Sequence, residues 1–411
     1  MVLSVEPTKK RFVLDVGLSS IAYALPVIAL YFFVQPGMAA KLGGTEYGIA
    51  LTLFTLTQFF DSAFVGAIGN VRLLRSGDDS SDNDCSRFLI VLLFVVCAAS
   101  IFALAIIEVL FGVFTPFDCL LMSISFIAMS FFDYFAIEYR VQLSYRQIVI
   151  SNLFLVIGFG IGYLSFCYFG PWEFIFIMGY MLGFAYVLPT TKPWKCRGAR
   201  HDSKGLIRQF IHYAGSNIST SFVAYGDRIV LFPMLGAFSV SLYASAAVAS
   251  KVINFITVPL GNVLLSYLVK VESMGVTLSR ARKLLAVLLI AMVLTGLFFF
   301  PVSRFLTALL YPQWCNESLQ YIPIIISAIC ISCYSNLLNT VVMRFVQSSF
   351  QLKVSVTRLV TYLVSAVLLT HVFGLYGFCF SLLVAEAVRF LMLVIRLFSR
   401  IRQDDIYNAC S

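Results

Sequence analysis

Apolar stretches of about twenty residues recur from one end of this chain to the other, and they constrain its fold more than any other feature. A helix needs about 20 residues to cross a hydrocarbon core of ~30 Å. The composition agrees, because 60% of the residues are hydrophobic and 12% are charged, against about 25% charged in ordinary soluble domains. We therefore expect an integral membrane protein, and soluble folds are excluded.

Twelve of these stretches are expected to span the membrane as helices. They are continuously apolar, whereas the strands of a membrane barrel alternate polar and apolar residues. The fold class predicted is thus an all-α integral membrane protein with about twelve transmembrane helices. The expected spans are 12–34, 47–68, 88–110, 117–135, 148–169, 172–188, 210–231, 238–264, 284–305, 321–343, 354–373 and 375–398.

Lysine and arginine are distributed unevenly between the two sets of loops. With a cytoplasmic N-terminus, 24 of the 29 basic residues fall on the inner side and two, Lys41 and Arg304, fall on the outer side. The remaining three, Arg228, Lys251 and Arg389, lie within spans. This asymmetry predicts an even number of spans and two cytoplasmic termini. It also accounts for the net charge of +9 through contact with anionic headgroups, so no nucleic-acid partner is expected.

Motifs of catalysis and of metal binding are missing from the sequence. It has no HExxH, no GxSxG and no Walker loop, its three histidines are scattered, and its outer loops are short. The acidic run at 77–84, "GDDSSDND", lacks the spacing of a calcium loop. We therefore expect no enzyme, no catalytic residue, no metal and no cofactor beyond a coupling H⁺ or Na⁺.

The chain is expected to consist of two similar halves. The polar, basic segment "TTKPWKCRGARHDSKG" predicts an N-terminal lobe at 1–189, a cytoplasmic linker at 190–208 and a C-terminal lobe at 209–411. "CYFGPWEFIF" around Gly170 resembles "HVFGLYGFCF" around Gly374, 204 residues later. "AKLGGTEYGIA" has a looser counterpart in "PMLGAFSVSLYASA". Two six-helix lobes with pseudo-two-fold symmetry around a central cavity would be typical of a transporter, and chance similarity among interface residues is the alternative.

Charges within the C-terminal spans are the first candidates for a site, because a charge at a helix centre costs about 2.5–3.5 kcal/mol. Span seven carries Asp227 and Arg228, span eight carries Lys251, and span twelve carries Glu386 and Arg389. Neighbours on a helix point about 100° apart, so Asp227 and Arg228 do not readily pair with each other, and at least one should face another helix or the cavity. Glu386 and Arg389 are three residues apart, so a mutual ion pair without any ligand is an open alternative.

The N-terminal spans carry acids. Asp61 and Asp133 each lie about two turns, roughly 10–12 Å, from the inner ends of their helices, and Asp15 lies close enough to the inner end to reach headgroup water. This pattern suits a cavity in which cations hold an anionic headgroup and carboxylates bind the coupling ion. Interhelical salt bridges without a transport role are the alternative.

The run "YGDRIVLFPMLGAFSVSLYASAAVASKV" resembles the seventh-to-eighth helix signature of polysaccharide exporters in the multidrug/oligosaccharidyl-lipid/polysaccharide (MOP) superfamily. Further landmarks are "KLGGTEYGIA", "FFDSAFVGAIGNVRLLR", "LLYPQW" and "FGLYGFCFSLLVAEAVRFL", so the resemblance covers nearly the whole chain. The branch it most resembles is the Wzx-type flippase of O-antigen, lipopolysaccharide and capsule biosynthesis. Such proteins move undecaprenyl-pyrophosphate-linked oligosaccharide units from the cytoplasmic to the periplasmic leaflet.

The resemblance implies a MOP-type fold, a place in the bacterial inner membrane, alternating access, and partners such as a polysaccharide polymerase and a chain-length regulator. By position it places Arg72 near the inner mouth of the cavity, although Asn70 before it departs from the usual motif. The residues expected to bind substrate are Arg228, Lys251, Arg389 and Arg72. Those expected to couple the ion are Asp227, Asp61, Asp133 and Glu386.

Two other functions are weighed against the flippase. A drug or cation antiporter of the same superfamily would favour an acidic cavity, and the cations of the C-terminal half argue against it. A membrane enzyme of polysaccharide synthesis would need a large outer loop or clustered His and Asp at a membrane face, and the sequence has neither.

Overall fold

The computed structural model describes residues 9–75, 82–112, 114–142, 144–191, 203–248, 252–253, 278–342 and 348–410. Every regular element in these ranges is a helix. Nine helical stretches among them are long and apolar enough to cross a membrane. Two of these, Gly17–Leu73 and Lys353–Ser399, have 57 and 47 residues, so each is long enough to cross a ~30 Å core twice. The prediction of an all-helical membrane protein is confirmed.

The chain forms two compact units, residues 1–229 and residues 230–411, which we call unit 1 and unit 2 and describe separately. The boundary between them falls within one helix, α8 (Ser203–Ala246). This helix begins inside the segment expected to be a linker, and its first part belongs to unit 1.

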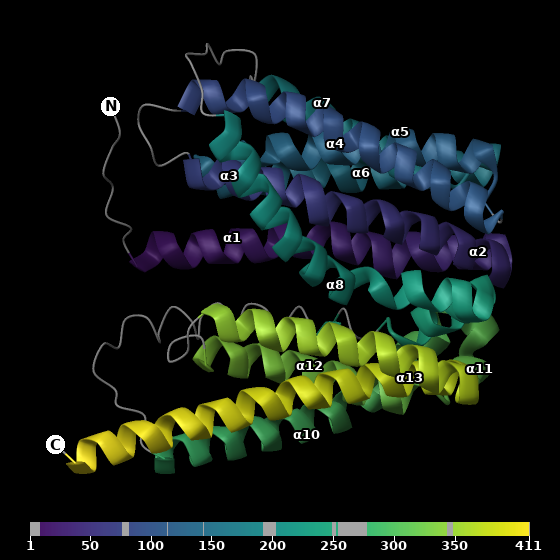
Figure 1. Ribbon diagram of the computed structural model, residues 1–411. Coiled ribbons are helices and arrows are strands. Elements are labelled where there is room, and N and C mark those ends of the chain that lie inside the picture. The colour runs from purple at the N-terminus through teal and green to yellow at the C-terminus, as the bar shows by residue number, and fades with distance from the viewer. Residues whose placement is uncertain are drawn as a thin grey trace. The chain divides into compact units, whose positions relative to one another are not determined.

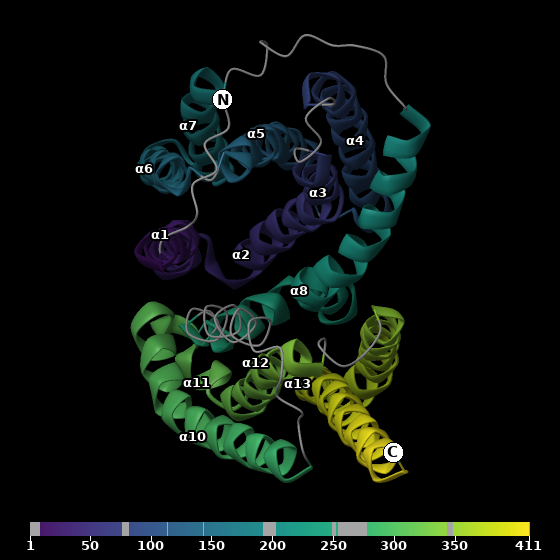
Figure 2. The same cartoon turned by 90° about the vertical axis from the view of Figure 1, so that its left-hand side faces the viewer.

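Unit 1 is a bundle of long helices (Figures 1 and 2). The turn before α5 shows how the sequence sets a helix start: the Thr115 hydroxyl accepts a hydrogen bond from the backbone N–H of Asp118, and Pro116 occupies the first helical position. The elements of unit 1, followed by the first part of α8, are α1 (Lys9–Ile28), η1 (Ala29–Val34), α2 (Gln35–Phe60), η2 (Asp61–Val65), α3 (Gly66–Arg75), α4 (Asp82–Phe111), α5 (Pro116–Val141), α6 (Tyr145–Phe169) and α7 (Phe174–Thr191).

Helices α6 and α7 pack closely because of two glycines four residues apart on α6. A methyl group at Gly158 would lie 2.5 Å from the backbone oxygen of Met178, and one at Gly162 would lie 2.5 Å from the backbone oxygen of Phe174. Small residues at this spacing let two helix backbones approach where no hydrophobic effect drives association within a lipid bilayer. The stretch "GFGIG" therefore positions α7 against α6.

Glycines with positive φ stand at matching points of the suspected repeat. Gly43 (φ 77°, ψ 178°) and Gly236 (φ 80°, ψ 174°) have nearly the same backbone geometry, and each belongs to a compared motif that contains Leu-Gly. Gly170 and Gly374 also have positive φ, at 101° and 58°. Gly170 and Gly374 differ in ψ, at −47° and −137°, so only the first pair shares its backbone geometry. L side chains rarely adopt positive φ, so the kinks at Gly43 and Gly236 both depend on glycine.

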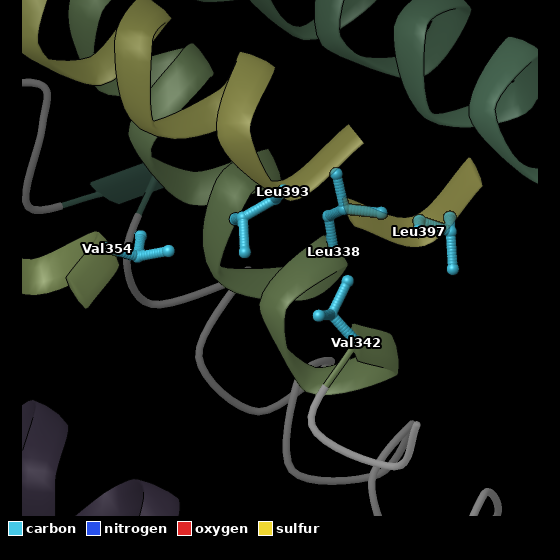
Figure 3. Close-up of a cluster of buried hydrophobic side chains, with 5 residues drawn as sticks. All are labelled: Leu338, Val342, Val354, Leu393 and Leu397. Carbon is cyan, nitrogen blue, oxygen red and sulfur yellow. The ribbon is translucent and has the colours of Figure 1, made fainter. Parts of the chain in front are cut away.

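Unit 2 contains the last part of α8, from Val230 onward, and the elements that follow it, ending in a helix bent at Gly374. The elements after α8 are α10 (Leu278–Leu310), η4 (Pro312–Trp314), α11 (Cys315–Ser318), α12 (Ile322–Val342) and α13 (Ser348–Cys410). Figure 3 shows a buried cluster that joins α12 to both arms of α13, and we call it the apolar core. Its members are Leu338, Val342, Val354, Leu393 and Leu397.

Candidate functional site

Unit 1 brings together the two acids that were predicted from their matching depth. Asp61 is buried on η2 and Asp133 is half-buried on α5, and their carboxyl groups lie close enough to interact electrostatically. Ser130, one turn before Asp133, also lies beside Asp61. Two like charges in a low-dielectric interior repel strongly. This arrangement, which we call the acidic pair, can therefore hold one proton or one small cation.

The backbone at the acidic pair is unusual. Asp61 is the first residue of η2, a π-helical segment, and a second π-helical segment, η1, contains Tyr31. Tyr180 on α7 and Tyr225 on α8 lie near both Asp61 and Asp133. Single π-helical turns are rare and occur frequently at functional sites. Among the described residues no three His, Cys, Asp or Glu side chains gather as metal ligands.

The side chains of Asp227 and Arg228 do not pair with each other, and that of Arg228 faces another helix. The Asp227 carboxylate accepts a hydrogen bond of 2.8 Å from the backbone N–H of Arg228. The buried Arg228 guanidinium donates to the Thr55 hydroxyl of α2 at 3.2 Å. Asp227 therefore binds the helix backbone, and the side chain of Arg228 reaches across to α2.

Polar contacts fasten the first part of α8 beside the acidic pair. Asn217 donates to the backbone oxygen of Ser62 at 3.3 Å, and the Ser221 hydroxyl donates to the Ser62 hydroxyl at 2.8 Å. Ser62 directly follows Asp61 on η2. These contacts place α8, with Arg228 and Tyr225, against the helix that carries the coupling candidate Asp61.

Arg72 has a carboxylate partner within unit 1. Its Nη2 lies 3.1 Å from Glu138 Oε2 on α5, and Gln142 donates to the other oxygen of Glu138 at 3.0 Å. Arg72 is buried, and the contact joins the last turns of α3 and α5. The Arg72 guanidinium, which was predicted to bind substrate, thus links α3 to α5 through an ion pair. Lys251, the candidate on span eight, lies outside the described residues.

Unit 2 holds a cluster of two arginines around one glutamate, which we call the guanidinium cluster. Glu386 Oε1 accepts a hydrogen bond from Arg358 Nη2, and Glu386 Oε2 lies 3.7 Å from Arg389 Nη1. The side chains of Arg358, Glu386 and Arg389 are 16%, 9% and 11% exposed. The pairing of Glu386 with Arg389 that the sequence left open is present, and Arg358 joins it from the other arm of α13.

Two polar side chains of α12 complete the guanidinium cluster. Arg389 Nη2 donates to the Asn336 side-chain oxygen at 2.7 Å, and Arg358 Nη2 lies 3.4 Å from the Ser332 hydroxyl. Ser332 and Asn336 are four residues apart, so they share a face of α12. With two guanidinium groups and one carboxylate, the cluster carries an excess of positive charge among the described residues.

Several partners in these sites were not predicted from the sequence, and Arg358, Glu138 and Thr55 are the ones that bind a predicted charge most directly. Arg358 was counted with the inner-side cations, although it lies four residues inside the expected span 354–373, and that position was the available signal. Glu138 and Thr55 carried no signal, because the arginines that reach them lie 66 and 173 residues away along the chain. Residues so distant in sequence come together only through tertiary packing.

No protein-family model matches the sequence, and no curated protein matches it. Solved structures with a similar fold do match. A multidrug resistance MATE family transporter of the MOP superfamily, in an inward-facing conformation, is 12% identical, with 96% of each chain covered and a TM-score of 0.60. Lipid II flippase MurJ, in an inward closed conformation, is 14% identical, with 93% of this chain and 87% of that chain covered and a TM-score of 0.66.

A third similar structure is the eukaryotic MATE transporter AtDTX14, which is 15% identical, with 95% of this chain and 98% of that chain covered and a TM-score of 0.60. At these identities the likeness shows the fold alone. The chain therefore has the fold of the MOP-superfamily transporters over nearly its whole length, as the sequence motifs predicted.

Proposed function

We propose that this protein is a flippase for undecaprenyl-pyrophosphate-linked oligosaccharides of O-antigen or capsule. It moves them from the cytoplasmic to the periplasmic leaflet of a bacterial inner membrane by alternating access, driven by H⁺ or Na⁺, with both termini in the cytoplasm. The polyprenyl tail stays in the hydrocarbon, so only the charged headgroup needs a polar path. No bond is made or broken in this step.

The guanidinium cluster of unit 2 is the observation that carries this proposal. The two positive charges of Arg358 and Arg389 outnumber the single negative charge of Glu386. All three side chains are largely buried within a membrane-spanning stretch. A buried excess of guanidinium groups favours an anionic cargo, because their N–H donors match phosphate oxygens in a low-dielectric setting. Arg228 and Lys251 are further substrate contacts in the proposal.

In the proposed mechanism the acidic pair binds the coupling ion, H⁺ or Na⁺. Asp61 and Asp133 lie together in unit 1, and a proton or Na⁺ bound there would relieve their repulsion. Occupation of the pair would then depend on the ion gradient across the membrane, which supplies the driving force. Asp227 binds its own helix backbone, so the acidic pair is the stronger coupling candidate.

The same pair favours a second function, a drug or cation antiporter. Carboxylates buried in a transporter can bind cationic compounds directly, and multidrug MATE transporters are among the proteins with this fold. The guanidinium cluster opposes this function because it repels a cationic cargo.

Transport of a fluorescent undecaprenyl-pyrophosphate oligosaccharide in liposomes tests the proposal. The readout is the rate at which inner-leaflet headgroups become accessible to an external glycosidase, with and without a proton or sodium gradient. Protein-dependent exposure is expected, and Arg389→Gln should slow it. Arg304→Gln, which removes an exposed arginine, is the matched control and should leave the rate unchanged. Efflux of cationic dyes without headgroup exposure would establish the antiporter instead.

A further inference from the structure

We propose that the guanidinium cluster is an anion-exchange site: Glu386 is the resident anion of Arg358 and Arg389, and a phosphate group of the cargo displaces it. This inference rests on the proposed function, because it names the chemical group that unit 2 recognises. It also assigns a role to Arg358, and it makes Glu386 a competitor of the cargo rather than a holder of the coupling ion.

One buried guanidinium nitrogen of the cluster has no acceptor among the described residues, so it could bind an anion. A guanidinium group has five N–H donors, yet Arg389 Nη1 and Glu386 Oε2 are buried without a hydrogen-bond partner among the described residues. Their separation of 3.7 Å is too long for a hydrogen bond. A buried donor without an acceptor is costly. A phosphate oxygen beside Arg389 would satisfy this donor, which the carboxylate of Glu386 does not reach.

The apolar core shows from which side a ligand can reach the cluster. Val354 lies four residues before Arg358 and Leu393 four residues after Arg389, so each shares a helix face with its arginine. Both apolar residues belong to the apolar core, which packs the end of α12 against α13 (Figure 3). The positions of Val354 and Leu393 along α13 therefore put apolar packing on this side of the guanidinium cluster. Asn336, which binds Arg389, is exposed on α12. The ligand therefore approaches past Asn336.

The depth of the cluster suits the headgroup of a lipid. Asn336 lies six residues before the end of α12 at Val342, which is roughly 9 Å along a helix. Arg389 lies ten residues, or roughly 15 Å, before Ser399, where the last membrane-spanning stretch ends. A phosphate attached to a polyprenyl tail can reach this depth with its tail still in hydrocarbon. Free pyrophosphate has the same chemistry without the tail.

Binding measurements on the purified full-length protein in lipid nanodiscs test the exchange. The probes are undecaprenyl diphosphate and inorganic pyrophosphate, titrated separately. Glu386→Gln keeps the shape of the side chain but removes the competing charge, so it should tighten binding of undecaprenyl diphosphate by about tenfold or more. Arg358→Gln and Arg389→Gln should each weaken it by about tenfold. Arg304→Gln, again the exposed control, should change nothing.

The two probes separate the two sources of phosphate. Tightening by Glu386→Gln for the lipid probe alone supports a lipid-headgroup site, and tightening for both probes supports a site that recognises the phosphate group itself. Glu386→Asp provides a second variant if Glu386→Gln fails to fold, because it keeps the charge but retracts it from Arg358. It should tighten binding by less than Glu386→Gln.

A purely structural ion cluster gives the opposite result. In that case Glu386→Gln would weaken the binding of undecaprenyl diphosphate or leave it unchanged, and it would lower the thermal unfolding midpoint. This outcome overturns the exchange site. If the wild-type protein flips the fluorescent oligosaccharide but binding is insensitive to the Glu386 and arginine variants, the exchange site is wrong and the proposed function stands. If the wild-type protein neither binds undecaprenyl diphosphate nor flips the oligosaccharide, both are wrong.

Discussion

The two units place charge within the membrane in opposite ways. In unit 1 two carboxylates, Asp61 and Asp133, lie together among hydroxyl groups, so the acidic pair has an excess of negative charge when both are ionised. In unit 2 a single carboxylate, Glu386, lies between Arg358 and Arg389, so positive charge is in excess. Charge imbalance of this kind is costly in a membrane. The difference in charge is the basis of the proposal that unit 1 holds a mobile cation and unit 2 holds an anion.

Removal of the acidic pair should have the largest effect and would break the comparison if it had none. We expect Asp61→Asn and Asp133→Asn each to reduce gradient-driven flipping to the rate seen without a gradient, because the repulsion between two carboxylates that a bound cation relieves is then absent. The measurement is the liposome assay with and without an imposed gradient. Glu46→Gln, at an exposed acid, is the control and should retain the full gradient response. A normal response in both Asp variants would exclude coupling at this pair.

The ion pair between Arg72 and Glu138 has one charge of each sign, in contrast to the acidic pair and the guanidinium cluster. Arg72→Gln leaves Glu138 without its guanidinium partner, so it should lower the free energy of unfolding by about 3 kcal/mol. The double variant Arg72→Gln/Glu138→Gln should recover most of this loss, as thermal unfolding in detergent would show. Recovery identifies a structural pair. A double variant that folds well but no longer flips the oligosaccharide would instead support the substrate role predicted for Arg72.

The Thr55 hydroxyl tests how Arg228 is positioned. Thr55→Val removes the acceptor of the Arg228 guanidinium while keeping a branched side chain of similar size. We expect a loss of about 1.5 kcal/mol of unfolding free energy and weaker binding of undecaprenyl diphosphate. Thr55→Ser retains the hydroxyl and should bind like the wild-type protein. Equal binding by all three proteins would show that this contact does not prepare Arg228 for a ligand.

The kink glycines sharpen the comparison at the level of the backbone. Gly43→Ala in unit 1 and Gly236→Ala in unit 2 should each cost about 1–2 kcal/mol, because both positions have positive φ although neither is crowded. Gly160→Ala is the matched control, since it lies in equally open space within α6 and should be neutral or stabilising by up to about 1 kcal/mol. Thermal unfolding of the three variants would check this. Unequal costs at Gly43 and Gly236 would argue against equivalent kinks.

Part of the candidate site could be predicted from local sequence. A charge in an apolar span is conspicuous, so Asp61, Asp133, Glu386 and Arg389 were identified without a structure, and the matching depth of the two aspartates agrees with their proximity in unit 1. The spacing of Glu386 and Arg389 left their pairing as an alternative, and the structure contains this pair. The partner of Arg228 could not be predicted, because Thr55 is one of several hydroxyl residues in the expected span 47–68.

The sequence by itself determined that the chain is helical and membrane-spanning and which charges lie within its apolar spans. These properties are local, because about twenty apolar residues suffice for a span and a charged residue inside one is visible without any knowledge of its neighbours in space. Only the tertiary structure decided that Arg358 joins Glu386 and that Arg72 is paired with Glu138. The physical reason is that such contacts form between residues on different helical segments, so helix packing selects the partner for each charge.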